Sequence, residues 1–184
     1  MNEINVLILS AGRRVELVQC FKNAAHKLNI NSNIVAADCS GTAPALYFAD
    51  SIVKLPRISE PNYISSIIEA CKTNDISLVA PTIDTDLLLL AENKDKSEKE
   101  THAKVLISDT KVIEICRDKF NTHRFLEDNS FGVPKMYTDD EIENDEVQYP
   151  LFIKPISGSS SINAYKVNNK NELNVYRNLI NKPI

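Results

Sequence analysis

The chain has 184 residues, of which 43% are hydrophobic and 25% are charged, proportions that fit a globular protein and exclude a disordered or fibrous one. Its formal net charge is −4. This balance excludes a nucleic-acid or anionic-membrane surface built on excess Lys and Arg, although a small anion can still bind at a local site. The N-terminal segment MNEINVLILSAGRR has the reverse of a signal peptide's charge order, and the longest aliphatic run is far shorter than the roughly 20 residues that span a bilayer, so we expect a cytoplasmic protein.

The first part of the chain alternates short aliphatic runs with segments of helical period. The apolar spacing predicts one helix between the first two runs, a second over 63–72 and a third from Asp84 onward. The polar run 92–102 is interpreted as a solvated helix end or loop. This alternation is typical of a parallel α/β sheet, with strands predicted at 5–9, 33–37, 51–55, 77–81 and 103–107.

The pattern changes after residue 107, and we place a domain boundary near 108–111. Helical segments are predicted through Leu126, followed by a turn at Gly132 to Pro134 leading into a strand. Two further strands then face each other across a Gly/Ser loop, and a last helix follows near 171–180. A β-hairpin with flanking helices predicts an α+β domain over 111–184, after an α/β domain over 1–110.

The four cysteines are widely spaced, without a CxxC pair or zinc-ligand spacing, so we expect reduced and mostly buried thiols and no metal site. The three histidines share no spacing with a catalytic triad, and there is no GxSxG elbow.

The segment SAGRR (10–14) follows the first predicted strand and opens the first helix, where parallel α/β sheets bind anionic ligands. Gly12 and Arg13 are therefore candidate substrate-binding residues, but a tight turn at Gly12 with solvated arginines is an equal alternative. A GxGxxG fingerprint is absent, which counts against a nicotinamide cofactor.

Three acidic residues lie at or beyond the carboxyl ends of predicted strands. Asp38 is interpreted as a turn or cap residue rather than a ribose ligand. Asp84 and Asp86 are candidate ligands of a metal or a substrate amine, but capping the following LLLLA helix is the favoured interpretation.

Lys154 closes the apolar run LFI (151–153), which we interpret as a buried strand. Burying a Lys costs several kcal/mol unless its ammonium meets an anion or reaches water. The Gly/Ser loop that follows offers backbone N–H groups and hydroxyls suited to phosphate oxygens. Taken alone, these features also describe a solvated edge-strand Lys beside an ordinary hairpin loop.

Three segments in this order, VLILSAGRR, CRDKFNTHRFLEDNSFGVP and YPLFIKPISGSSSINAYKV, resemble the ATP-grasp superfamily along the whole chain. The resemblance is closest to carboxylate–amine ligases of the carbamoyl-phosphate-synthase-like and biotin-carboxylase-like kind. It implies a parallel-sheet, Rossmann-like pre-ATP-grasp domain over 1–110 and the first, α+β lobe of an ATP-grasp domain over 111–184. The matching positions are Asp118, Lys119, Phe125, Leu126, Gly132, Pro134, Pro150, Lys154, Pro155 and Ser157 to Ser161.

The resemblance implies that Lys119 and Lys154 hold ATP phosphates and that a flap closes over them. The flap comprises Ser157, Gly158, Ser159, Ser160 and Ser161. Such ligases use ATP and Mg²⁺ to make an acyl phosphate from a small-molecule carboxylate, which an amine then attacks. A homodimer is expected by the same analogy.

Family members continue into a second lobe that carries the Mg²⁺ ligands, and this sequence ends at Ile184 without it. We therefore expect the N-terminal portion of a ligase, inactive as these residues alone. The alternative is a non-catalytic nucleotide- or metabolite-binding α/β module.

Overall fold

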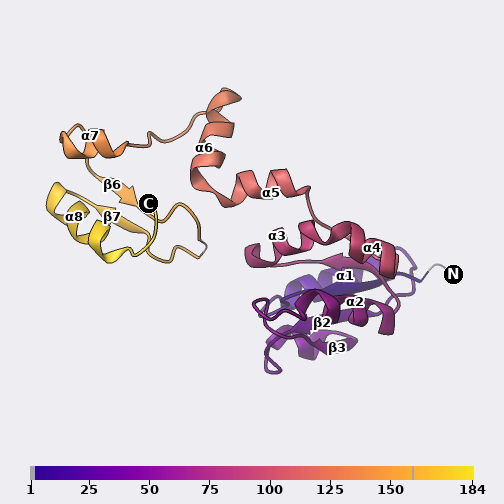
Figure 1. The fold of residues 1–184 in the computed structure, drawn as a ribbon. Helices are drawn as coiled ribbons and strands as arrows, with labels where there is room; N and C mark the ends of the chain where they lie inside the picture. The colour runs from indigo at the N-terminus through magenta and orange to yellow at the C-terminus, as the bar shows by residue number, and fades with distance from the viewer. Residues whose placement is uncertain (1–2, 159) are drawn as a thin grey trace. The chain divides into compact units, whose positions relative to one another are not determined.

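The computed structural model describes residues 3–158 and 160–184. The chain forms two compact units, Met1–Ile113 and Glu114–Ile184, each of which is described by itself. Figure 1 shows the course of the chain through both.

A five-stranded parallel sheet forms the centre of the first unit, in the order β3-β2-β1-β4-β5. The strands are β1 (Asn5–Ile8), β2 (Ile34–Asp38), β3 (Ser51–Lys54), β4 (Ile76–Ala80) and β5 (Lys104–Val105). Each coincides with a predicted aliphatic run, so the α/β fold class is confirmed. The strand order reverses between β1 and β4, and parallel sheets bind ligands beyond the carboxyl ends of their strands at such a reversal.

Alternating side chains of β1 build a core on each face of the sheet. Val6 and Ile8 pack with Val18 and with the 3₁₀ helix η1, whereas Leu7 packs on the opposite face with Tyr63. The covering elements are α1 (Val15–Lys27), η1 (Pro44–Phe48), α2 (Tyr63–Thr73), α3 (Asp84–Glu92) and α4 (Lys94–Thr101). Period-2 alternation on strands and a helical stripe on α1 and α2 thus produce three layers.

The polar run 92–102 forms a separate helix, α4, where a solvated helix end or loop was expected. Its Lys and Glu residues favour helix, and Ser97 supplies a small side chain for its buried side. Glu98 accepts a hydrogen bond from the Val105 amide at 3.0 Å, which ties the helix to β5.

The second unit contains a two-stranded antiparallel sheet that pairs Phe152 with Lys166 and Ile153 with Tyr165. Its buried core consists of Ile153, Val167, Leu173 and Ile180. The elements are α5 (Thr110–Arg117), which crosses the unit boundary, α6 (Lys119–Asp128), α7 (Asp139–Glu143), β6 (Leu151–Ile153), β7 (Tyr165–Val167) and α8 (Lys170–Leu179).

The strand expected after Pro134 does not form: the segment between α6 and α7 is irregular. Its contacts are made to other elements instead of to a neighbouring strand. His123 Nε2 lies 2.9 Å from the Pro134 carbonyl oxygen, and the Gln148 amide donates to the Tyr137 hydroxyl at 3.1 Å. A strand needs a neighbouring strand that bonds to its backbone groups. This segment instead makes the contacts to His123 and to the Gln148 amide.

Three of the four thiols are exposed, so the expectation of mostly buried cysteines was wrong. Only Cys71, on α2, is buried, and burial raises the pKa of its thiol to about 11.

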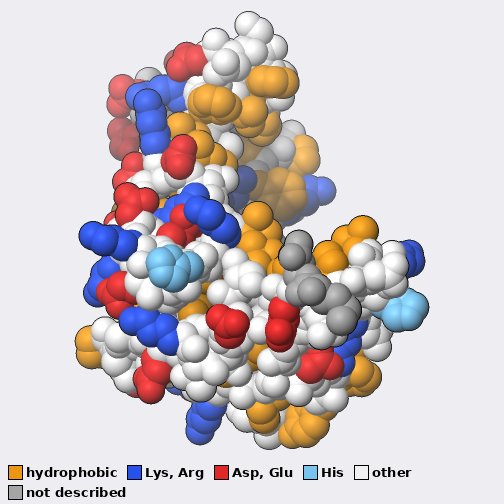
Figure 2. Space-filling model, turned by 90° about the vertical axis from the view of Figure 1, so that its right-hand side faces the viewer, with side chains coloured by type: hydrophobic (Ala, Val, Ile, Leu, Met, Phe, Trp, Pro, Cys, Tyr) orange, Lys and Arg blue, Asp and Glu red, His pale blue; other side chains and the backbone are white. Residues whose placement is uncertain are grey.

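Within residues 3–158 and 160–184, the helices fall short of the length and apolar character required to cross a bilayer. On the face drawn in Figure 2, acidic and basic side chains lie among one another instead of forming a patch of one sign.

Candidate functional site

The loop after β1 is held by backbone and side-chain hydrogen bonds. Gly12 has φ +51°, and a Cβ there would lie 3.1 Å from Nη1 of Arg14. Its amide donates to Asp38 Oδ2 at 2.9 Å, and its carbonyl accepts from the Ala45 amide at 3.0 Å. The Gly12 amide is thus bonded to Asp38, and the positive φ of Gly12 belongs to a tight turn. Gly12 and Arg13 stay candidate substrate-binding residues. Arg13 is exposed beside it.

Asp38, at the end of β2, stabilises two turns through hydrogen bonds of its carboxylate. Its Oδ2 accepts from the Gly12 amide, and its Oδ1 accepts from the Ser40 amide at 2.8 Å. This is the turn role proposed for Asp38 from the sequence.

Asp86 is fully buried. Its favoured interpretation from the sequence was a residue that caps the following helix. Helix α3 begins at Asp84 with Ile83 as the N-cap residue and without a side-chain cap. Asp86 instead accepts hydrogen bonds from Ser10 Oγ at 2.7 Å and from the Tyr63 hydroxyl at 3.1 Å. The capping interpretation was wrong for Asp86 because the helix turns this side chain inward, toward two hydroxyl donors.

Burial raises the pKa of Asp86, and the bonds from Ser10 and Tyr63, with the nearby Arg14, oppose that rise. Burial, together with the charge of Asp86, raises the pKa of Tyr63. The Tyr63 hydroxyl therefore keeps its proton and donates a hydrogen bond to the Asp86 carboxylate.

A cavity of about 290 Å³ adjoins this cluster beyond the carboxyl ends of the strands. Sequence reasoning pointed to this edge but missed Arg57 and Tyr63. The available signal was that Arg57 lies just beyond the third predicted strand and that Tyr63 opens the helix predicted after it. The cavity is lined by Ser10, Asp38, Cys39, Leu55, Pro56, Arg57, Ile58, Tyr63, Ile83 and Asp86.

In the second unit, Lys119 is fixed at the start of α6. Asp118 caps the helix by accepting from the Asn121 amide at 2.9 Å. The Lys119 amide and its Nζ both donate to the carbonyl oxygen of Ile156, at 3.1 and 3.2 Å. The start of α6 is thereby joined to the segment that follows β6.

Lys154 lies close enough to Lys119 to affect its ionisation. Burial and then the charge of Lys154 lower the pKa of Lys119, while Asp118 acts in the opposite direction. The structure thus brings together two lysines that are far apart in the sequence.

The expectation that Lys154 closes a buried strand was wrong. Ile153 is buried, but Phe152 is 68% exposed and Lys154 is exposed as well. A two-stranded sheet with one covered face buries only alternate residues, so Lys154 reaches water without strain. Its proximity to Lys119, rather than burial, is what distinguishes it.

The loop after Lys154 uses backbone conformations that favour glycine. Gly158 has φ +141°, Ser160 has φ +58° and Ser161 has φ +56°. The Ile156 amide donates to the Pro183 carbonyl at one end of the loop, and the Ala164 amide donates to the Ser161 carbonyl at the other. Ser157, Ser160 and Ser161 are exposed, and the candidate residue Ser159 lies outside the described residues.

No three His, Cys, Asp or Glu side chains converge as a metal site in the part of the chain that the structure describes.

Two family models match the chain in succession. Residues 6–106 match the PylC-like N-terminal domain, and residues 116–184 match an ATP-grasp domain. No curated protein sequence matches the chain significantly.

Three solved structures of similar fold come from larger proteins. L-amino acid ligase from Bacillus licheniformis has a TM-score of 0.64 and 18% identity, over 97% of this chain and 43% of the ligase. N5-carboxyaminoimidazole synthetase from Staphylococcus aureus, complexed with ADP, has a TM-score of 0.66 and 16% identity, over 98% of this chain and 45% of the synthetase.

The biotin carboxylase domain of 2-oxoglutarate carboxylase from Hydrogenobacter thermophilus was solved as a dimer with MgADP, ADP and bicarbonate. It has a TM-score of 0.60 and 21% identity, over 96% of this chain and 40% of that domain. The chain therefore spans less than half the length of each of these relatives. With its two domains matched in order, the chain belongs to the ATP-grasp proteins, as a PylC-like N-terminal domain followed by an ATP-grasp domain.

Proposed function

We propose that this chain is the N-terminal portion of an ATP-dependent carboxylate–amine ligase and that Lys119 and Lys154 hold phosphate groups of ATP. In this proposal residues 1–110 are the pre-ATP-grasp domain and residues 111–184 the first ATP-binding lobe. The substrates are a small-molecule carboxylate and an amine. The ADP bound to the staphylococcal synthetase and the MgADP bound to the biotin carboxylase domain support the choice of nucleotide.

Two observations carry the proposal: Lys119 Nζ donates to the carbonyl oxygen of Ile156, which follows Lys154 closely in the chain, and the charge of Lys154 lowers the pKa of Lys119 more than Asp118 raises it. Within residues 3–158 and 160–184, no carboxylate lies within ion-pair distance of Lys119 or Lys154. Their mutual repulsion contributes to the lowered pKa of Lys119. An anion bound between them would relieve the repulsion, and a polyphosphate offers several oxygens to both.

ATP supplies the phosphoryl group that converts a carboxylate to an acyl phosphate, and an amine then displaces the phosphate. The two lysines contribute positioning and charge neutralisation, which are the main requirements of phosphoryl transfer. In this proposal the backbone amides and hydroxyls of the Gly/Ser loop, including Ser157, Gly158, Ser160 and Ser161, add neutral hydrogen bonds to the phosphates as a flap. We assign no Mg²⁺ ligand within the described residues.

Calorimetric titration of residues 1–184 with ATP and, separately, with NADH tests this proposal. We expect ATP to bind, and we expect binding to weaken in Lys119→Met. Binding of NADH without any response to ATP would overturn the assignment.

The same sample tests whether these residues catalyse the reaction alone. We expect ATP binding without turnover, since the chain spans less than half of each of the three solved relatives described above. Release of phosphate coupled to acyl-phosphate formation would contradict this expectation. A homodimer, the state in which the biotin carboxylase domain was solved, is part of the proposal and is tested by light scattering.

A further inference from the structure

The cavity of the first unit has no role in the proposed phosphate site, because Lys119 and Lys154 do not line it. Its volume of about 290 Å³ lies at the lower limit of the pockets that proteins use for small molecules. Four apolar side chains, Leu55, Pro56, Ile58 and Ile83, form much of its wall.

The polar side chains on one side of the cavity present acceptors. Ser10 and Tyr63 each have a single hydroxyl proton, and each uses it in a hydrogen bond to Asp86. Their remaining capacity toward a ligand is therefore lone pairs. The Asp38 carboxylate adds two more acceptor oxygens, which are oriented by the Gly12 and Ser40 amides. A ligand that meets these oxygens must donate hydrogen bonds, and a positive charge would suit the two carboxylates.

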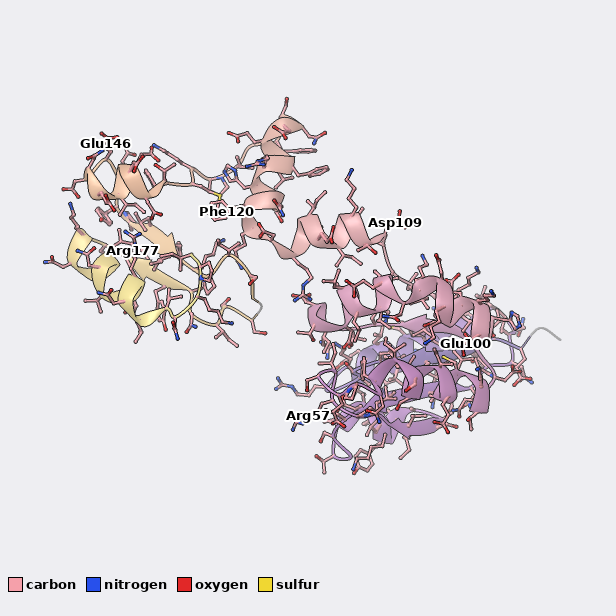
Figure 3. The ribbon with its side chains drawn as sticks, in the orientation of Figure 1. Arg57, Glu100, Asp109, Phe120, Glu146 and Arg177 are labelled. Atoms are coloured by element: carbon pink, nitrogen blue, oxygen red, sulfur yellow. The ribbon has the colours of Figure 1, made fainter. Side chains whose placement is uncertain are left out.

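A cation also lines the cavity, on the loop after β3. The Arg57 backbone is fixed by a bond from its amide to Glu60 Oε1 at 3.0 Å. Its guanidinium makes no ion pair or hydrogen bond with any other residue in the ranges 3–158 and 160–184, and Figure 3 shows it at the surface of the first unit. Such a group is suited to bind a carboxylate in a bidentate manner.

We infer that this cavity binds a small amino acid in its zwitterionic form. The ammonium group donates to the oxygens of Ser10, Tyr63 and Asp38, the carboxylate pairs with Arg57, and the side chain packs on the apolar wall. The assignment of this amino acid as a substrate rests on the proposed ligase function, whereas its binding does not.

Cys39 allows a test on the unaltered chain, because this exposed thiol lines the cavity. The measurement is the rate of N-ethylmaleimide labelling at neutral pH, followed by peptide mass spectrometry. The exposed Cys20 and Cys116, which do not line the cavity, serve as internal controls. The probes are L-norleucine, hexanoate, which lacks its ammonium, and pentylamine, which lacks its carboxylate.

We expect L-norleucine at ten times its dissociation constant to slow the labelling of Cys39 about tenfold, since only the unliganded fraction reacts. Cys20 and Cys116 should be unaffected, and hexanoate and pentylamine should protect Cys39 far less at the same concentration. Absence of protection by L-norleucine, or equal protection by either of the other probes, would overturn the inference.

Two variants locate the contacts. Arg57→Gln and Tyr63→Phe should each weaken L-norleucine binding about tenfold, the cost of one good hydrogen bond to a charged group. Tyr47→Phe is the matched control, because Tyr47 is 74% exposed and does not line the cavity. Unchanged affinity in Arg57→Gln would contradict the inference without requiring Tyr63→Phe to fold.

ATP titration of the same samples separates this inference from the ligase proposal. Protection of Cys39 without ATP binding would leave the amino-acid site standing and remove the proposed function. ATP binding without protection would do the reverse.

Discussion

At the scale of single residues, two charged side chains, Asp86 and Lys154, lie in opposite environments. Asp86 is buried and satisfied by hydroxyl donors, so its position is determined by hydrogen bonds. Lys154 is exposed and close to another cation, so its charge is available to a ligand. A buried charge must be paired to be tolerated, whereas unpaired like charges mark a site that an opposite charge can complete.

Replacing Lys154 with Met should weaken ATP binding to residues 1–184 by roughly ten- to a hundredfold. A hydrogen bond to a charged group contributes about 1.5–3 kcal/mol, and each 1.4 kcal/mol is about tenfold in affinity. Calorimetry with ATP measures the change. Lys170→Met removes the same charge from a lysine that pairs with Asp145 at 3.3 Å, and it should change the affinity less than twofold, that is, by under about 0.5 kcal/mol. Equal ATP affinity of Lys154→Met and the unaltered chain would show that Lys154 is only a solvated surface residue and does not bind ATP.

The raised pKa of Asp86 predicts a pH dependence of stability with a defined sign. A carboxyl group that holds its proton more tightly when folded contributes stability that is fully present below its unfolded pKa, about 3.9, and lost as the pH rises through its folded pKa. In the Asp86→Asn variant the side-chain amide at this position does not titrate. The free energy of unfolding of the first unit, unaltered chain minus variant, should therefore fall as the pH rises from about 4 toward neutrality.

Urea unfolding of both proteins across this pH range provides the measurement for Asp86. Asp95→Asn, at an exposed position on α4 of the same unit, is the control for loss of a carboxylate. Curves for the unaltered chain and Asp86→Asn that run parallel with pH would exclude the predicted linkage.

At the scale of elements, the start of α6 connects local helix chemistry to the proposed phosphate site. Asp118 satisfies an amide that the helix itself leaves unpaired. The next residue, Lys119, is thereby held where both its amide and its Nζ reach the Ile156 carbonyl. A capping residue followed directly by a functional lysine explains why these two residue types stand together.

Asp118→Ala should destabilise α6 by about 1 kcal/mol, the usual cost of losing an N-cap side chain. It should also weaken ATP binding, because Lys119 is then less firmly placed. Asp118→Asn keeps the capping oxygen and should preserve most of the stability. Hydrogen exchange of the α6 amides reports the first effect and calorimetry the second. Unchanged exchange of α6 in Asp118→Ala would contradict the capping role.

At the scale of the whole molecule, the two units differ in how much core they contain. Two clusters of buried side chains cover the two faces of the parallel sheet in the first unit. The second unit is shorter, and its cluster of buried hydrophobic residues has only four members among those described, Ile153, Val167, Leu173 and Ile180. Small domains bury a smaller fraction of their surface and are correspondingly marginal.

We therefore expect urea to unfold residues 114–184 before residues 1–113. Because the chain contains no Trp, hydrogen exchange followed by mass spectrometry is the suitable measurement. ATP at a hundred times its dissociation constant should stabilise the second unit by about 2.7 kcal/mol and leave the first unchanged. A single transition for all amides, or an equal effect of ATP on both units, would refute this expectation.

The sequence by itself determined the α/β class, the five strands and the hairpin, because aliphatic runs and helical stripes are local signals that tertiary context did not override. The pair Asp118 and Lys119 and the Gly/Ser loop could be predicted for the same reason, because each is a contiguous motif in the sequence. Only the tertiary structure decided that Asp86 is buried against Ser10 and Tyr63. It also decided that Phe152 and Lys154 are exposed and that the charge of Lys154 acts on Lys119. Each of these depends on residues far apart in the chain, whose approach is set by packing of the sheet and its helices rather than by local preference.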